Sequence, residues 1–248
     1  MTDFKSRLTM MSEMRKKHLT QLRANQLDPL KDKTGSASSS LVGTLRFLAV
    51  SEYVLQSSKN TFTGNLTESA ELQTKLFSRF EAGESISPSY VSMMSYKALL
   101  NALASGNEEC AKNLASKMGG RSDIEKEYDR PFDIAFGYAL KLITLADLAS
   151  AAQWVDALEL ACKDAENTDF MGYTKVLRAI LNSSLSDANT GLVEVVAGHK
   201  RQSSGKGLFK DTEDELLCVW GVAVTNLARM RGLNVNAIEP LIPSDLLY

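Results

Sequence analysis

The sequence predicts an all-α protein: a single domain of stacked antiparallel helical hairpins, which is a TPR-like helical bundle or short solenoid. Apolar residues recur at helical spacing along most of the chain. Short polar breaks divide that pattern into helix pairs, and no segment shows the sustained apolar–polar alternation of a strand. The 248 residues are 44% hydrophobic with only five prolines, which is enough apolar side chain for a packed core.

The first 30 residues predict an N-terminal amphipathic helix that ends before Asp28-Pro29. Its apolar residues fall near helical spacing: Phe4, Leu8, Met11, Leu19 and Leu22. Residues 31–40, KDKTGSASSS, are polar and of low complexity, so they predict a flexible Ser-rich loop. The helical-hairpin domain is then expected over residues 41–248.

Two single helices open that domain. Residues 41–56 are apolar on most sides, as in a buried helix, whereas 67–81 predict an amphipathic one. The stripe of the second is formed by Leu72, Leu76, Phe77 and Phe80. Gly83 follows it, and glycine is typical of a helix C-terminus.

Three helical hairpins follow, each recognised by its break. The breaks are expected at 105–107, near 147–150, and at 182–184, between Ala- and Leu-rich stretches. Offsets of 77 and 42 residues align parts of these units, and such spacings are near those of helical-hairpin repeats. Helix pairs of this composition resemble one another, so no named repeat is assigned.

The C-terminal part predicts one more helix and a tail. Thr212 and Glu215 fit a capping box, and the helix from Leu216 is expected to end at Gly232. The tail over 233–248 contains two prolines, so we expect it to run extended over the bundle.

Composition restricts the class of function. No apolar run reaches the roughly 18 to 20 residues of a membrane span, and the N-terminus has no apolar block typical of a secretory signal. We therefore expect a cytoplasmic protein without a membrane partner. The three cysteines lack a CxxC spacing, which favours buried thiols over a disulfide framework or a zinc site. They are Cys110, Cys162 and Cys218.

The charge is unevenly distributed. A net charge of −2 gives no basic footprint for nucleic acid. Residues 121–169, however, hold eleven Asp and Glu against five Lys and Arg. Solvated helix faces explain such an excess, and a docking surface for a basic partner is the functional alternative. The candidate partner-binding residues are Asp123, Glu125, Glu127, Asp129, Asp133, Glu213 and Asp214.

Catalytic motifs are missing from the sequence. Of the two histidines, His18 is expected to be exposed and His199 to cap a helix C-terminus. Gly205-Lys206-Gly207 lacks the spacing of a phosphate loop. Trp154 and Trp220 lie in apolar helical contexts, which favours core packing. We therefore expect no enzyme, no cofactor and no metal.

One resemblance gives the function a direction. A hairpin closing on His199, the runs Leu227-Ala228-Arg229 and Arg231-Gly232-Leu233, and the end Pro243 to Leu247 resemble the C-terminal half of the immunity protein 49 family of bacterial polymorphic toxin systems. The resemblance covers roughly residues 90–248. It implies a protein that binds and neutralises a cognate toxin or effector, and no contact residue carries over with it.

Two other functions stay open. The chain could be a helical-repeat adaptor or scaffold that binds a peptide or partner protein. It could also be an α-helical enzyme, which would need carboxylates from separate helices to meet in a pocket. The oligomeric state and the identity of the toxin are left open by the sequence.

Overall fold

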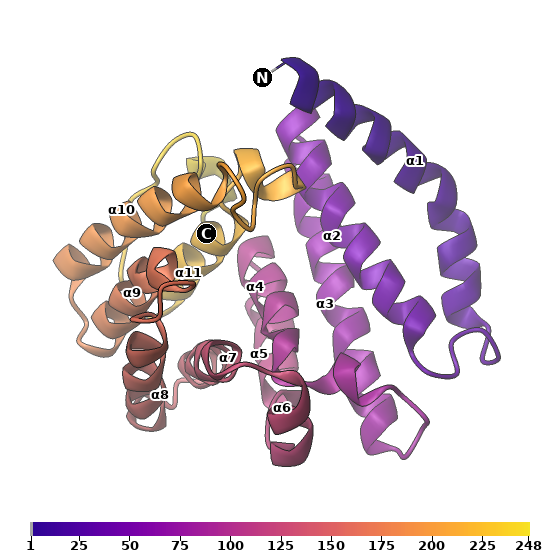
Figure 1. Ribbon diagram of the computed structural model, residues 1–248, viewed down its shortest axis with the longest axis horizontal. Coiled ribbons are helices and arrows are strands. Elements are labelled where there is room, and N and C mark those ends of the chain that lie inside the picture. The colour runs from indigo at the N-terminus through magenta and orange to yellow at the C-terminus, as the bar shows by residue number, and fades with distance from the viewer. Residues whose placement is uncertain (1) are drawn as a thin grey trace.

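The computed structural model describes residues 2–248 and confirms an all-α protein. Eleven α-helices and five short 3-10 helices are found in this range, with no strand and one isolated β-bridge between Ile238 and Ile242. In Figure 1, helices α1, α2 and α3 lie side by side along one edge, and α9 and α10 lie on the opposite side.

The N-terminal helix α1 (Thr2–Leu27) packs along α2 (Ser36–Gln56). Leu8 is buried against Phe47 and Leu48, which accounts for the predicted apolar stripe. Met11, although part of that stripe by spacing, is exposed.

The prediction of a loop over residues 31–40 is wrong for its second half, because α2 already begins at Ser36. A buried Asp32 fixes this start: its carboxylate accepts hydrogen bonds from the Ser38 N–H at 2.8 Å and from the Ser38 hydroxyl at 2.5 Å. The same carboxylate accepts a hydrogen bond from the Arg79 guanidinium at 2.5 Å. The preceding turn is therefore anchored to α3 (Lys59–Glu81).

Helix α3 begins eight residues before the predicted start at Thr67, because Phe62 and Leu66 extend its buried face. Two 3-10 turns, η1 (Pro88–Val91) and η2 (Met93–Ser95), then lead to the hairpins.

The breaks between the paired helices lie at or close to the predicted positions. The pairs are α4 (Tyr96–Ser105) with α5 (Glu108–Lys117), α7 (Pro131–Thr144) with α8 (Leu148–Ala161), and α9 (Met171–Leu181) with α10 (Leu185–Gln202). The short helix α6 (Ser122–Tyr128) precedes α7, and η3 (Thr168–Phe170) precedes α9. Each second helix begins with a side chain that accepts a backbone N–H: Asn107, Asp147 and Ser184.

The predicted helix from Leu216 begins later than expected. Residues Glu213–Leu216 form the 3-10 turn η4, and α11 runs over Val219–Met230. The Thr212 hydroxyl accepts a hydrogen bond from the Asp214 N–H, whereas the Glu215 carboxylate accepts one from the Asp211 N–H. The reciprocal capping box is therefore not formed.

The last helix closes the chain into a bundle, because α11 packs against α4. The Asn226 side chain in α11 donates hydrogen bonds to the carbonyls of Leu103, at 3.0 Å, and Leu246, at 3.2 Å, and accepts one from the Tyr248 N–H. Leu246 belongs to η5 (Ser244–Leu246), the last turn of the tail. The predicted extended tail is thus tied to two helices and buries Val235 and Ile242 completely.

Candidate functional site

Two of the acids predicted from α6 to α7 are bonded within the molecule. Glu125 is 7% exposed and accepts hydrogen bonds from the Tyr138 hydroxyl at 3.1 Å and from the Arg121 N–H at 3.0 Å. The Asp129 carboxylate accepts hydrogen bonds from the backbone N–H groups of Met93, at 2.7 Å, and Met94, at 2.9 Å. Both carboxylates accept hydrogen bonds from within the molecule, and their part in partner binding stays a prediction.

The acids predicted at the C-terminal turn have a structural partner as well. Glu213 and Asp214 in η4 both pair with Arg46 of α2, and the Asp214 contact is 2.5 Å. The three side chains are at most 17% exposed. This pairing joins α2 to η4, and the part of Glu213 and Asp214 in partner binding stays a prediction. We call these three residues the Arg46 clasp.

Three predicted acids have other surroundings. Asp123 and Glu127 are exposed on α6. Asp133 is partly buried in α7, where it accepts a hydrogen bond from the Tyr96 hydroxyl at 3.1 Å. Of the seven predicted residues, only Asp133 therefore lines the cavity described next.

A cavity of about 400 Å³ lies where several helices begin or end. Its walls come from the starts of α4, α7 and α11, the end of α10, and the segments 166–170 and 208. The lining combines aromatic side chains with charged and amide side chains. Its inner residues are Tyr96, Lys97, Phe132, Asp133, Phe170, Gln202 and Trp220.

Aromatic packing keeps these walls in place. The Trp220 ring centroid lies 5.8 Å from that of Tyr96 and 5.9 Å from that of Phe170, and Phe132 lies 5.3 Å from Phe170. These distances are typical of favourable aromatic pairs. Trp220 is a core residue as predicted, whereas Trp154 lies at the core edge, stacked on Tyr138 at 4.3 Å.

Lys97 is the charged group that the cavity walls leave without a partner. Its ammonium forms no ion pair or hydrogen bond with the residues that the structure describes. Burial lowers the pKa of Lys97, and the nearby Arg46 charge adds to this, while Asp133 opposes it. A half-buried lysine with a lowered pKa in a cavity is typical of a binding or reactive site.

The rim of the cavity is formed by exposed residues. Tyr128 is 41% exposed and Leu208 is 55% exposed, and Arg130 and Glu166 form a loose ion pair of 3.7 Å. All four line the opening. We call them the cavity rim.

His199 has a different role from the predicted helix cap. It is 3% exposed and stacks on Phe209 with a centroid distance of 4.7 Å. Burial lowers the pKa of His199 to about 4, opposed by the backbone of Asp214. Its imidazole is therefore a neutral packing group at pH 7.

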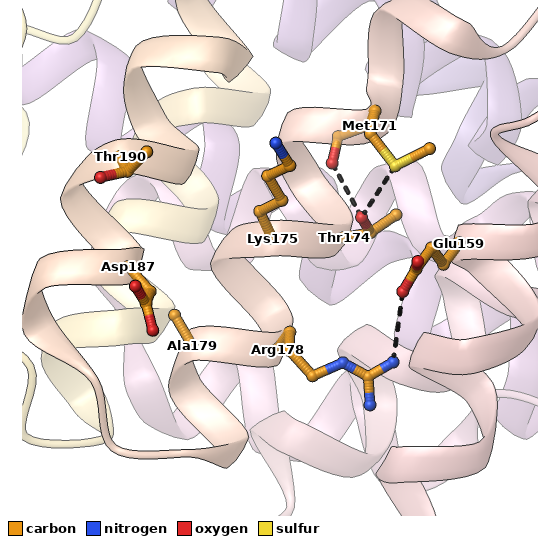
Figure 2. Close-up of a pocket in the computed structure, with 8 residues that line it drawn as sticks. All are labelled: Glu159, Met171, Thr174, Lys175, Arg178, Ala179, Asp187 and Thr190. Atoms are coloured by element: carbon orange, nitrogen blue, oxygen red, sulfur yellow. Dashed lines mark hydrogen bonds and ion pairs between the residues drawn. The ribbon is translucent and has the colours of Figure 1, made fainter.

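A second hollow, of about 360 Å³, lies between α8, α9 and α10. Figure 2 shows Arg178 reaching Glu159, with a contact of 3.5 Å, and the Thr174 hydroxyl bonded to Met171. Lys175 pairs with Glu194. Both of its cationic side chains already form ion pairs. This hollow therefore has no unpaired cation for a ligand, whereas the cavity beside Lys97 has one.

The comparisons with known proteins give no relative: no family model, no curated protein and no solved structure matches this chain. Within residues 2–248, no helix combines the length and apolar character needed to cross a membrane. In the same range, no three His, Cys, Asp or Glu side chains form a group that could hold a metal ion.

Sequence reasoning missed Arg46 and Lys97, although each left a signal. Arg46 is the one charge within the apolar run LVGTLRFLAV, and Lys97 interrupts YKALLNALA. A lone charge in a helix expected to be buried needs a partner or a ligand. The partners could not be assigned, because Arg46 and Asp214 are separated by 168 positions.

Proposed function

We propose that this protein acts by binding another protein, and that it neutralises a toxin produced together with it. The cavity rim is the observation that carries the proposal. Exposed Tyr128 and Leu208 stand at the mouth of a cavity whose walls are fixed by aromatic packing. Tyrosine anchors beside a preformed hollow are typical of protein interfaces.

Carboxylates next to the rim favour a basic partner. Glu166 belongs to the rim, Asp164 lies two residues before it, and Glu127 directly precedes Tyr128; all three are exposed. Exposed Lys126, Arg130 and Lys163 stand among these carboxylates, so the surface near the rim is of mixed charge. Its carboxylates attract a partner that presents cations at matching positions. The resemblance to immunity proteins supplies the kind of partner, and occlusion of a toxin requires no active site on the inhibitor.

The proposal is tested by co-expression with the product of the adjacent gene. We expect toxicity to disappear and a complex to co-purify. A complex that forms without relief of toxicity would favour the adaptor function. The absence of both complex and relief contradicts toxin neutralisation by this chain.

Charge reversal at the rim locates the surface. The double variant Glu127→Lys/Glu166→Lys should slow association with the partner at least tenfold at low salt and flatten its salt dependence. Glu109→Lys, which reverses an exposed acid in α5, is the matched control and should keep the parent rate. Equal rates for both variants would place the interface elsewhere.

A further inference from the structure

The cavity interior carries two opposite charges that do not pair with each other. Lys97 belongs to α4 and Asp133 to α7, and both line the cavity. No ion pair joins them, although the Asp133 charge partly opposes the lowering of the Lys97 pKa by burial. One Asp133 oxygen accepts the Tyr96 hydroxyl, and the other has no hydrogen bond to a residue between 2 and 248.

This arrangement leaves each charge incompletely compensated. A half-buried ammonium loses hydration, and a carboxylate bound next to it restores the lost interaction. The free Asp133 oxygen can likewise accept a hydrogen bond from a cation. A ligand with both charges therefore fits better than an anion or a cation alone, because the inner wall carries one charge of each sign.

The uncharged lining residues of the cavity indicate what the uncharged part of the ligand is. Edges of Phe132, Phe170 and Trp220, each 6–7% exposed, line the cavity beside the two charges, together with the amides of Asn167 and Gln202. A volume of about 400 Å³ is within the roughly 300–1,000 Å³ of ligand pockets, which are mostly apolar with a few placed polar groups. Aromatic faces also attract an ammonium group.

The hollow is kept open by its own hydrogen bonds. The Gln202 amide donates to Asp169 at 2.7 Å and accepts the Leu208 N–H at 2.8 Å. The loop after α10 is thereby tied to η3, so the walls do not need a ligand to be in place. A preformed site loses little binding free energy to ordering.

We propose that this cavity binds a free α-amino acid with an apolar side chain, its carboxylate at Lys97 and its ammonium at Asp133. The side chain lies against Trp220 and Phe170. This inference does not depend on toxin neutralisation.

The test is calorimetric titration of the unaltered chain with four probes. L-Phenylalanine and L-leucine carry both charges, phenylacetate only the anion and phenethylamine only the cation. We expect one or both amino acids to bind at least tenfold more tightly than either single-charge analogue. The proposal is overturned if phenylacetate or phenethylamine binds as tightly as the amino acids. It is also overturned if neither amino acid gives saturable heat at concentrations up to about 10 mM.

Variants then assign the two charges. Lys97→Met should weaken amino-acid binding to the level of phenethylamine, and Asp133→Asn, which keeps an acceptor for Tyr96, should weaken it to that of phenylacetate. Lys175→Met, in the hollow of Figure 2, is the control and should bind as the parent does. Unchanged binding by the Lys97 and Asp133 variants overturns the assignment, and the probe comparison does not rely on any variant folding.

The outcome is separable from that of the proposed function. Loss of amino-acid binding in Lys97→Met with toxin neutralisation intact would mean that the cavity interior and the rim act independently. Failure of neutralisation with normal amino-acid binding contradicts the proposed function alone.

Discussion

At the scale of single residues, buried ionisable groups set the chemistry of this molecule. His199 and Lys97 both have lowered pKa values, and burial is the largest cause in each. They differ in surroundings: His199 stacks on Phe209 in the core, whereas Lys97 lines a cavity. Burial of His199 makes the stability of the fold depend on pH. Burial of Lys97 leaves an ammonium group without a partner among residues 2–248, which is the basis of the proposed ligand site.

His199 should make the fold sensitive to acid. Its pKa of about 4 is below the unfolded value, so between these pH values the unfolded chain binds the proton and the folded chain does not. The contribution of neutral His199 to the free energy of unfolding is therefore fully present above the unfolded pKa and decreases as the pH falls towards the folded pKa. By pH 5 the decrease should reach about 2 kcal/mol. Urea unfolding of His199→Phe at pH 7.5 and pH 5 measures it by difference from the parent.

Two outcomes are informative in that experiment. His199→Phe should show a smaller drop in unfolding free energy than the parent, while His18→Gln, at an exposed position, should follow the parent. Parallel pH profiles for the parent and His199→Phe would exclude this role of the buried imidazole.

At the scale of elements, local signals predicted the helix pairs well. Asn107, Asp147 and Ser184 each cap the helix that follows, and capping depends on residues within a few positions of one another. The start of α11 was predicted incorrectly, because the Cys218 N–H donates to the Leu241 carbonyl at 2.9 Å. That contact comes from 23 positions further along the chain, where no local pattern can reveal it.

The cavity could not be predicted for the same reason. Its lining comes from segments between residues 94 and 220, and only the fold brings them together. The sequence did identify Asp133 as a candidate, but on the basis of its acidic neighbours. The structure separates it from them, because Glu125 and Asp129 contact Tyr138 and the η2 backbone instead.

Glycine decides how closely α9 and α10 approach. A Cβ on Gly172 of α9 would meet the backbone of Val195 in α10, whereas one on Gly64 of α3 meets nothing. Gly172→Ala should therefore lower the unfolding free energy by about 2 kcal/mol, as overpacking does. Gly64→Ala should raise it by up to ~1 kcal/mol, since alanine favours a helix interior. Thermal unfolding of both variants tests the pair; a stable Gly172→Ala would contradict the close approach.

At the scale of the whole molecule, the first and last parts of the chain are held together. The Arg46 clasp joins α2 to η4, and the Tyr53 hydroxyl donates to Asp245 at 2.7 Å. Figure 1 shows the segment before α11 reaching across to α2. The molecule is closed by polar contacts as well as by its apolar core.

Removing the clasp should be costly. Arg46→Met leaves Glu213 and Asp214 without their cation in a largely buried place, and breaking one side of such a pair destabilises by about 3 kcal/mol or more. Lys112→Met removes an exposed ion pair with Glu108 and should change stability by less than about 0.5 kcal/mol. Denaturant unfolding distinguishes the two, and similar values would mean that the clasp adds little.

The three cysteines can report whether the molecule unfolds as one unit. All are buried, and burial raises the pKa of Cys110 to about 11 and those of Cys162 and Cys218 to about 12. Little reactive thiolate is therefore present at pH 8. We expect a thiol reagent to modify none of them quickly in the native protein, and all three over one common range of denaturant. Fast modification of one thiol would reveal local opening there.

The Arg46 clasp has a consequence for how this architecture can change. Open helical arrays gain or lose repeats because each unit contacts only its neighbours. Here, an extra hairpin inserted between α5 and α9 would move η4 away from Arg46 and part α11 from α4. Duplication of a helix pair would therefore cost the contacts of Arg46 with η4 and of α11 with α4, so these contacts restrict the number of hairpins.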